Sequence, residues 1–379
     1  MKILLTATVQ SHICQFHKPL VEVLHEYGCE VHVAAKDNLA EKNGLKLDFV
    51  DKVYNISFAR SPKNKDNLLA YKKLKEIIEK EHYDIIHCNT PMGGIVTRLA
   101  ARKARKLGAK VYYTAHGFHF YKGAPIKNWI IFYPIEKIFS KITDKIITIT
   151  DEDYQLAVNK FYCKIERTHG VGVDEKRFYI VSKKEQLEIR KKFNLKKDQK
   201  IILCVGELLP NKNQKIAIQA MEKIVKKYPE TQLLIAGNGP EKENLEKLIR
   251  SLKLEKNIKM LGYVINLQEY QKIADIAVSC SKREGLPLNI VEAMLSGTPV
   301  VASLNRGHRE LIHNGENGFI VDVDDDKKMA EKILELFENK NLFNQIKEKA
   351  EEYVKSYTFK NVKNELKYIY LNDLRKERD

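Results

Sequence analysis

The sequence predicts two α/β domains of similar size, each a doubly wound parallel sheet, which face each other across a cleft. Short apolar runs alternate with segments of helical period from one end of the chain to the other. The apolar runs are continuous rather than alternating, which is typical of strands that are buried on both faces of a parallel sheet. A glycine-containing loop at Gly170–Asp174 interrupts the alternation and divides the chain into two series.

The first series predicts an N-terminal Rossmann-like domain over residues 1–175. Its predicted strands are Ile3–Ala7, Val31–Ala35, Ile85–Cys88, Val111–Thr114 and Ile146–Ile149. Helical periods lie between them, for example Leu20–Tyr27, Leu68–Lys80 and Val96–Leu107. Because helical periods separate the strands, we expect the strands to run parallel.

The second series predicts another Rossmann-like domain over residues 176–356. It begins with a very charged helix at Lys183–Lys200, which a polar turn follows. Its predicted strands are Ile201–Val205, Gln232–Ala236, Ile276–Ser279, Pro299–Ala302 and Phe319–Val321. Residues 357–379 form an amphipathic helix that we expect to pack back toward the N-terminal domain. Open α/β sheets bind ligands at the carboxyl ends of their strands, so we expect the ligand in the cleft.

The excess of positively charged residues favours anionic partners but does not identify which kind. The 379 residues include 66 Lys and Arg against 50 Asp and Glu, a net charge of +16. This surplus favours nucleic acid, an anionic membrane surface or phosphorylated small molecules, or it is only a solvated lysine-rich surface. The charge is spread through folded-looking segments, which argues against a basic arm that wraps DNA.

Cysteine usage and hydropathy favour a cytoplasmic protein. The six cysteines are scattered without a C-x-x-C pair, so neither a disulfide framework nor a structural zinc site is expected. The longest apolar stretch, Trp129–Ile135, is far shorter than the ~20 residues of a membrane-spanning helix. We therefore expect a soluble or peripheral protein.

The segment richest in candidate functional residues is 281–302. A predicted strand ends there in a loop with Glu284 and Gly285, and a predicted helix starts at Leu288. The free N–H groups and the positive dipole end of a helix start favour phosphate. Glu284 and Glu292, eight positions apart, repel phosphate but suit the hydroxyls of a ribose and a sugar ring. Two solvated surface glutamates are the alternative.

This segment resembles the E-x7-E signature of glycosyltransferase family 4. The match extends through Val205-Gly206, Lys212, residues 236–240, 261–264, 274–275, 307–310 and 317–319. Residues 114–123, Glu136 and residues 150–154 resemble capsular and exopolysaccharide members. The resemblance covers about residues 2–325. It implies a GT-B fold and a retaining enzyme that moves a hexose or N-acetylhexosamine from a nucleotide sugar, a UDP-sugar by expectation, to a saccharide or polyprenyl-linked acceptor in polysaccharide synthesis.

The resemblance also implies residue roles. Lys212 contacts the donor diphosphate, His116 and Glu284 hold the transferred sugar, and Glu292 holds the ribose. The leaving diphosphate oxygen deprotonates the acceptor, so no protein nucleophile is needed. Further donor-binding residues are expected to be Gly285, Leu288, Asn289, Tyr263, Gly237 and Gly239. The expected acceptor residues are His12, His17 and His119.

One departure from the family concerns the diphosphate. The family usually places arginine after the glycine of Val205-Gly206, where this chain has Glu207. The second positive charge must come from elsewhere, from Arg283 or Lys282, or is not required.

No metal and no cofactor beyond the nucleotide sugar is expected. Asp151–Asp153 and Asp322–Asp324 have the spacing of D-x-D metal ligands, but each lies at a predicted helix start, where acidic residues cap the helix.

Two rival functions remain: a phosphorylase or sugar-nucleotide epimerase on a similar fold, and a nucleic-acid-binding module, which the basic charge suggests but no binding motif supports. A further hypothesis concerns Tyr121–Lys141, which combines aromatic residues, including Trp129, with flanking lysines. Such a segment suits an anionic membrane surface, with rings in the interface. The alternative is that the aromatic residues belong to the core.

Overall fold

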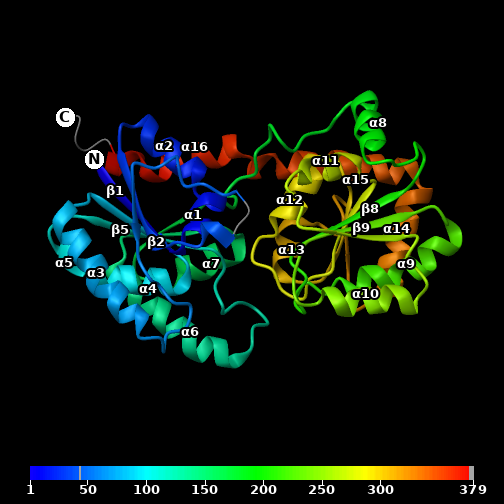
Figure 1. Ribbon diagram of the computed structural model, residues 1–379. Helices are drawn as coiled ribbons and strands as arrows, with labels where there is room; N and C mark the ends of the chain where they lie inside the picture. Colours follow the sequence, from blue (N-terminus) through cyan, green and yellow to red (C-terminus); the bar gives the residue numbers. More distant parts are fainter. Residues whose placement is uncertain (42–43, 375–379) are drawn as a thin grey trace. The chain divides into compact units, whose positions relative to one another are not determined.

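The computed structural model describes residues 1–41 and 44–374. The chain forms two compact units. Unit 1 comprises Met1–Gly172 together with the C-terminal segment from Phe359, and unit 2 comprises Val173–Thr358. Each unit is a sheet with helices packed on it (Figure 1).

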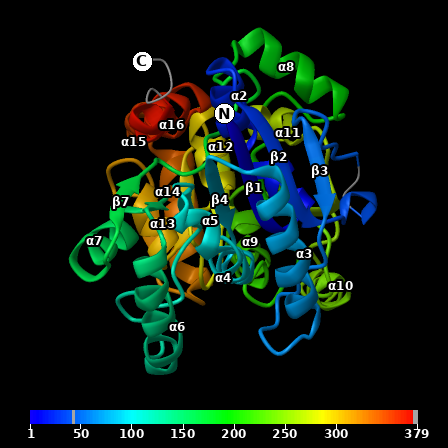
Figure 2. The ribbon, with the colours of Figure 1, turned by 90° about the vertical axis from the view of Figure 1, so that its left-hand side faces the viewer.

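Unit 1 is built on a parallel sheet with the strand order β3-β2-β1-β4-β5-β6-β7. Figure 2 shows part of this order, from β7 on the left through β4, β1 and β2 to β3 on the right. The strands are β1 (Lys2–Val9), β2 (Glu30–Lys36), β3 (Lys52–Asn55), β4 (Ile85–Asn89), β5 (Lys110–Ala115), β6 (Lys145–Thr148) and β7 (Lys164–Arg167). The order reverses between β1 and β4, and open α/β sheets bind ligands at such a switch point.

Helices cover both faces of this sheet. They are α1 (Gln10–Phe16), α2 (Lys18–Glu26), α3 (Asp66–Glu81), α4 (Pro91–Ala100), α5 (Arg102–Lys106), α6 (Ile126–Phe139), α7 (Asp151–Lys160) and α16 (Phe359–Leu374). One core cluster joins β1 and β2 to α2 and α16, and another joins the opposite face to α3 and α4. The continuous apolar runs of β1 and β2 supply side chains to both clusters, as expected for doubly covered strands.

The last helix, α16, belongs to unit 1. Its apolar face, including Leu366 and Tyr370, is buried against β1, β2 and α2. The Lys145 Nζ on β6 donates to Asp373 Oδ2 at 2.6 Å, and the Tyr370 hydroxyl lies 2.5 Å from His87 Nδ1 on β4. Apolar burial and these polar contacts together attach the tail to the sheet.

Unit 2 is a second parallel sheet, in the order β10-β9-β8-β11-β12-β13. Its strands are β8 (Ile201–Val205), β9 (Gln232–Ala236), β10 (Ile258–Gly262), β11 (Ile276–Ser279), β12 (Val300–Ser303) and β13 (Phe319–Val321). Its helices are α8 (Lys183–Lys192), α9 (Lys215–Lys227), α10 (Lys242–Ser251), α11 (Leu267–Ile273), α12 (Leu288–Leu295), α13 (Arg306–Leu311), α14 (Asp326–Glu338) and α15 (Lys340–Val354). The prediction of two Rossmann-like sheets is therefore confirmed.

Two details differ from the sequence-based expectations. The charged helix from residue 183 ends at Lys192, because Asn194 takes a left-handed conformation (φ +54°) that stops the helix. The structure also adds the strands β3, β7 and β10, none of which was predicted. In the described part of the chain, no helix combines the length and apolarity needed to cross a membrane.

Candidate functional site

The start of helix α12 forms the centre of the candidate site in unit 2. Strand β11 ends at Ser279, and the chain reaches the helix start at Leu288 through a short loop. No side chain caps the first turn, where Pro287 occupies the N-cap position. The Asn289 side chain donates to the Val205 carbonyl at 3.1 Å and so ties the helix start to the end of β8. Uncapped N–H groups of this kind are available to an anionic ligand.

Lys212 and Glu284, which the sequence singled out separately, form an ion pair. The Lys212 Nζ donates to Glu284 Oε1 at 2.6 Å, and the two side chains are 26% and 13% exposed. The loops that carry them are joined by further bonds, because Asn211 Nδ2 donates to the Arg283 carbonyl and the Lys282 N–H donates to the Asn211 carbonyl. The structure thus holds one cation and one carboxylate side by side at the carboxyl ends of β8 and β11.

Glu292 lies one turn into α12 and is partly buried. Burial raises the pKa of its carboxyl to about 8, although the positive charge of Arg177 offsets part of this rise. Among the described residues, the Glu292 carboxyl makes no hydrogen bond or salt bridge. A ligand that donates hydroxyl hydrogen bonds to this partly buried carboxyl group would be stabilised by them. Sequence reasoning missed Arg177, which lies near the start of unit 2 and matches no motif.

The glycines expected at the donor site shape its backbone. A Cβ on Gly237 (φ +153°) would lie 1.9 Å from the Gly206 carbonyl oxygen. A Cβ on Gly239 would lie 2.4 Å from the Leu208 carbonyl oxygen. The loops after β8 and β9 therefore pack backbone against backbone, and only glycine permits this approach.

The remaining expected donor residues follow the carboxyl ends of strands β10 and β11, at the same edge of the sheet as Lys212 and Glu284. Tyr263 directly follows β10 and is 53% exposed, and Leu288 is partly buried at the start of α12. Gly285 is in close contact with α13, since a Cβ on Gly307 would lie 2.6 Å from the Gly285 carbonyl oxygen. This contact positions the loop that carries Glu284.

His308 supports the same loop region and was not singled out as an individual residue, although the motif at 307–310 contains it. Its Nε2 lies 2.9 Å from Ser279 Oγ, its Nδ1 donates to the Ser303 carbonyl, and its backbone N–H donates to Asn305 Oδ1 at 3.0 Å. Burial lowers the pKa of His308 to about 4, so the ring is neutral. It is a buried connector between β11 and β12 rather than an exposed ligand.

The two candidates for the second cation differ in their surroundings. Both are exposed, as is Glu207, but Lys282 Nζ lies 3.4 Å from Asp324 Oδ2, whereas the Arg283 side chain forms no ion pair among the described residues. Asp324 also accepts from Asn213 Nδ2 at 3.0 Å, and Asp325 caps α14. These acidic residues therefore hold loops and a helix start in place.

The aspartate cluster of unit 1 has a similar structural role. Thr150 caps α7, as its side chain accepts from the Asp153 N–H. Asp153 in turn accepts from the Phe118 N–H at 3.1 Å, and Glu152 accepts from the Lys122 N–H at 2.9 Å. These contacts position the loop that follows His116.

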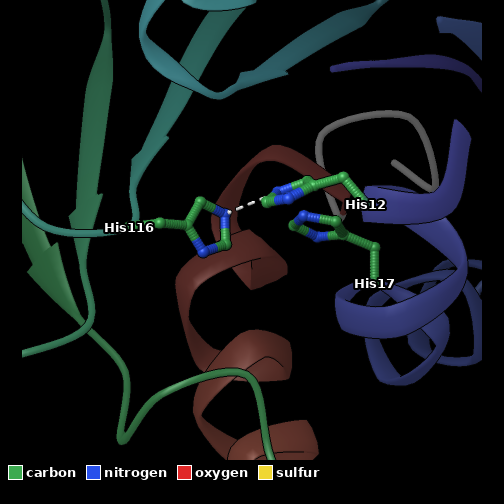
Figure 3. Close-up of side chains that lie close together, drawn as sticks. All are labelled: His12, His17 and His116. Atoms are coloured by element: carbon green, nitrogen blue, oxygen red, sulfur yellow. Dashed lines mark hydrogen bonds between the residues drawn. The ribbon is translucent and has the colours of Figure 1, made fainter. Parts of the chain in front are cut away.

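Three histidines meet in unit 1 (Figure 3). His12 is on α1, His17 lies between α1 and α2, and His116 directly follows β5. The Nε2 atoms of His12 and His116 are 3.2 Å apart, and one ring nitrogen of each of the three lies within 4.8 Å of the others. Burial lowers the pKa of all three rings, that of His116 to about 4, and so favours their neutral forms. His119 lies outside this group and stacks on Phe132, with ring centroids 4.6 Å apart.

A cavity of ≈ 580 Å³ lies beside this cluster within unit 1. Its polar lining includes His12, Arg60, His119 and Glu136. Its apolar lining includes Met92, Ile95, Phe118, Phe120, Ile131, Phe132 and Ile135. Glu136 is fixed at this wall because it pairs with the buried Arg98 at 2.9 Å. The cavity suits a ligand with both hydroxyl and apolar parts.

Helix α6 forms one wall of the cavity, and its orientation corrects part of the membrane hypothesis. Trp129 packs against the core of unit 1 and donates to the Tyr121 carbonyl at 3.2 Å, so it does not project from the surface as the interfacial ring we expected. The side chains that do project are Ile126, Ile130 and Ile138, which are 78%, 68% and 63% exposed. The outward apolar surface of α6 is therefore aliphatic.

Comparisons with known proteins agree with this arrangement. Residues 185–353 match the family model of "Glycosyl transferases group 1", and residues 2–150 match that of "Glycosyl transferase 4-like". The chain is 41% identical over 343 residues to the "Putative glycosyltransferase EpsD" of Bacillus subtilis, covering 90% of this chain and 88% of that protein. It is 27% identical, over 80% of each chain, to the Escherichia coli "UDP-Gal:alpha-D-GlcNAc-diphosphoundecaprenol alpha-1,3-galactosyltransferase". The solved structure of Anabaena HepE in complex with UDP shares the fold, with a TM-score of 0.79, 20% identity, and coverage of 98% of this chain and 100% of that one.

Proposed function

Because the chain belongs to the group 1 glycosyltransferases, with a family 4-like N-terminal half, we propose that it transfers a hexose or N-acetylhexosamine from a UDP-sugar to a saccharide or lipid-linked saccharide acceptor in cell-surface polysaccharide synthesis. The observation that carries the proposal is the Lys212–Glu284 ion pair beside the uncapped start of α12, with Glu292 one turn further along. The ammonium group and the helix start suit the diphosphate of a nucleotide sugar, and the two carboxyl groups suit the hydroxyls of its sugar and its ribose.

The donor diphosphate binds at the start of α12 and draws Lys212 away from Glu284. The helix N–H groups and the ammonium stabilise the charge that develops on the leaving diphosphate. The Glu284 carboxylate, released from Lys212, accepts hydrogen bonds from hydroxyls of the transferred sugar. Arg283 supplies the second positive charge, because the other candidate, Lys282, is already paired with Asp324.

The ribose binds at Glu292. Two ribose hydroxyls donate to its carboxylate, and hydrogen bonds to the charged form lower the pKa that burial has raised. Binding therefore satisfies a carboxyl group that makes no hydrogen bond within the described residues.

Transfer proceeds with retention of the anomeric configuration and needs no protein nucleophile. The bond from the anomeric carbon to the diphosphate oxygen breaks, and the bond to the acceptor oxygen forms on the same face of the sugar. The acceptor proton moves to the departing diphosphate oxygen. His116 contacts the transferred sugar, and no divalent cation is required because Lys212 and α12 balance the charge.

The acceptor binds at the cavity of unit 1, where His12 and His119 offer polar contacts. The apolar walls support an acceptor with a hydrocarbon part, and the Escherichia coli relative is named for a diphosphoundecaprenol acceptor. The exposed isoleucines of α6, with Lys122, Lys127 and Lys141 nearby in the sequence, bind the protein to an anionic membrane surface where such an acceptor resides.

The test is a donor and acceptor screen with purified protein. UDP-, GDP- and dTDP-sugars are mixed with polyprenyl-diphosphate saccharides, and nucleoside diphosphate release and glycosylated product are measured, the latter by NMR for anomeric configuration. We expect UDP release that depends on acceptor, persists in EDTA and yields a retained linkage. Phosphate-dependent sugar release or sugar interconversion without acceptor would instead identify a phosphorylase or an epimerase. Transfer that stops in EDTA and returns with Mg²⁺ would refute the metal-free mechanism.

A further inference from the structure

The histidine cluster of unit 1 has the composition of a transition-metal site. His12, His17 and His116 come from two separate stretches of chain, and each places one ring nitrogen within 4.8 Å of the other two (Figure 3). Two nitrogen ligands on a tetrahedral zinc ion, each at about 2.05 Å, lie about 3.3 Å apart. The Nε2 atoms of His12 and His116 are already 3.2 Å apart.

His17 supplies the second, independent observation. Its side chain is buried, with 4% of the residue exposed, and its Nε2 has no hydrogen-bond partner in the described part of the chain. A buried ring nitrogen without a partner costs free energy unless something satisfies it. The hydrogen bond between His12 and His116 leaves His17 Nε2 without a partner, whereas an ion shared by the three rings would provide a partner for a nitrogen of each ring.

We propose that His12, His17 and His116 bind a divalent transition metal of the zinc class, with three nitrogen ligands and an open fourth position. Imidazole ligands suit Zn²⁺, Co²⁺, Ni²⁺ and Cu²⁺, whereas Mg²⁺ and Ca²⁺ require oxygen ligands, of which this cluster supplies none. Asn89 Oδ1, 3.4 Å from His116 Nε2, lies beside the cluster and is placed to hydrogen-bond a water at the fourth position.

The site has a consequence for transfer that rests on the proposed function. A metal takes the His116 nitrogen that is otherwise available to the sugar, so occupancy inhibits transfer rather than supporting it. Metal binding itself is independent of that role and is measured without any substrate.

The experiment titrates Co²⁺ and Zn²⁺ into the full chain after dialysis against chelator. Cobalt(II) visible absorption reports nitrogen coordination, and calorimetry gives stoichiometry and affinity. We expect one metal per chain, no binding of Mg²⁺, and an affinity at least tenfold weaker in His12→Ala. His119→Ala, on the neighbouring cavity wall, and His313→Ala, in unit 2, are matched controls that should bind like the wild type.

Folding of each variant is checked by its circular dichroism and thermal unfolding, and His12→Gln replaces His12→Ala if the latter does not fold. X-ray absorption of the wild-type zinc complex gives a readout that needs no variant, and it should show three histidine nitrogens. Absence of a cobalt spectrum in the wild type, unchanged affinity in a folded His12 variant, or a coordination shell without histidine would each overturn the proposal. If metal binds as expected but transfer is unaffected, the site stands and the role assigned to His116 in transfer fails.

Discussion

Lys212 Nζ and Glu284 Oε1 lie 2.6 Å apart, so the principal cation and the principal carboxylate of the candidate donor site neutralise each other within the protein. A diphosphate that binds the ammonium must compete with this carboxylate. Under the proposed function, the carboxylate then requires new donors, which the hydroxyls of the transferred sugar would provide. That proposal therefore implies that sugar and diphosphate binding are coupled through this ion pair.

The ion pair predicts opposite effects of its two partners on UDP affinity. Lys212→Ala should weaken UDP binding about ten- to a hundredfold, the worth of a charged hydrogen bond. Glu284→Gln should bind UDP as well as the wild type or better, because Lys212 no longer has a competing anion, while kcat falls because the sugar loses its acceptor. Calorimetry with UDP and steady-state kinetics measure the two quantities. Lys215→Ala is the matched lysine control, and a large loss of UDP affinity in Glu284→Gln would contradict the coupling.

Glu292 should act on the ribose and not on the diphosphate. Glu292→Ala is expected to weaken UDP about ten- to a hundredfold. In the wild type, 2′-deoxy-UDP should bind more weakly than UDP, and this difference should disappear in the variant because the hydroxyl has lost its partner. The exposed Glu222 provides the control substitution Glu222→Ala. Equal UDP affinity in wild type and Glu292→Ala would remove the assignment.

The raised pKa of Glu292 predicts how stability depends on pH. A folded-state pKa of about 8, above the ordinary value of 4.5, means that the folded protein favours the protonated carboxyl. Ligand-free wild type should therefore lose stability as the pH rises from about 4.5 to 8, whereas Glu292→Gln should not lose this contribution. Since the side chain is partly exposed, we expect the variant to be more stable by about 1–2 kcal/mol at pH 8 and equal to wild type below pH 4.5. Urea unfolding at several pH values measures this, and a difference that is independent of pH would be inconsistent with it.

The aliphatic surface of α6 predicts reversible membrane binding. Co-sedimentation with liposomes should require anionic lipid. Binding should be much weaker in 0.5 M salt, because salt screens the attraction between lysines and head groups. Replacing Ile126 and Ile130 by Ser should reduce binding to anionic vesicles, as should charge reversal of Lys122 and Lys127. Charge reversal of Lys191 and Lys192 on α8 tests whether net charge alone is responsible. Equal partition onto neutral and anionic vesicles, or none, would leave α6 without this role.

The fold was predictable wherever a strand is buried on both faces, because burial demands a continuous apolar run. Interior strands such as β1, β4 and β8 were predicted within a few residues of their bounds. The missed strands β3, β7 and β10 lie at sheet edges, where partial exposure permits polar and charged residues. Their sequences carry no apolar run for a pattern to reveal.

The site was predictable residue by residue but not as a set of contacts. Lys212 and Glu284 each belong to a motif, yet their ion pair joins positions 72 residues apart. The contact between His12 and His116 spans 104 residues. Spacing within a motif carries no information about such pairs. They arise only when two strands bring their carboxyl ends to the same edge of a sheet, β8 and β11 for the ion pair and β1 and β5 for the histidines.

The placement of α16 in unit 1 makes that unit discontinuous in the chain, and this sets an order of assembly during synthesis. Unit 2 is complete in sequence at Thr358, before the ribosome has made any residue of α16. The sheet of unit 1 is translated first. However, the apolar surface of β1, β2 and α2 remains uncovered until Leu366 and Tyr370 have been synthesised. The earliest part of the nascent chain is therefore the last to be finished, and a stop codon near the end of the gene damages the unit encoded at its beginning.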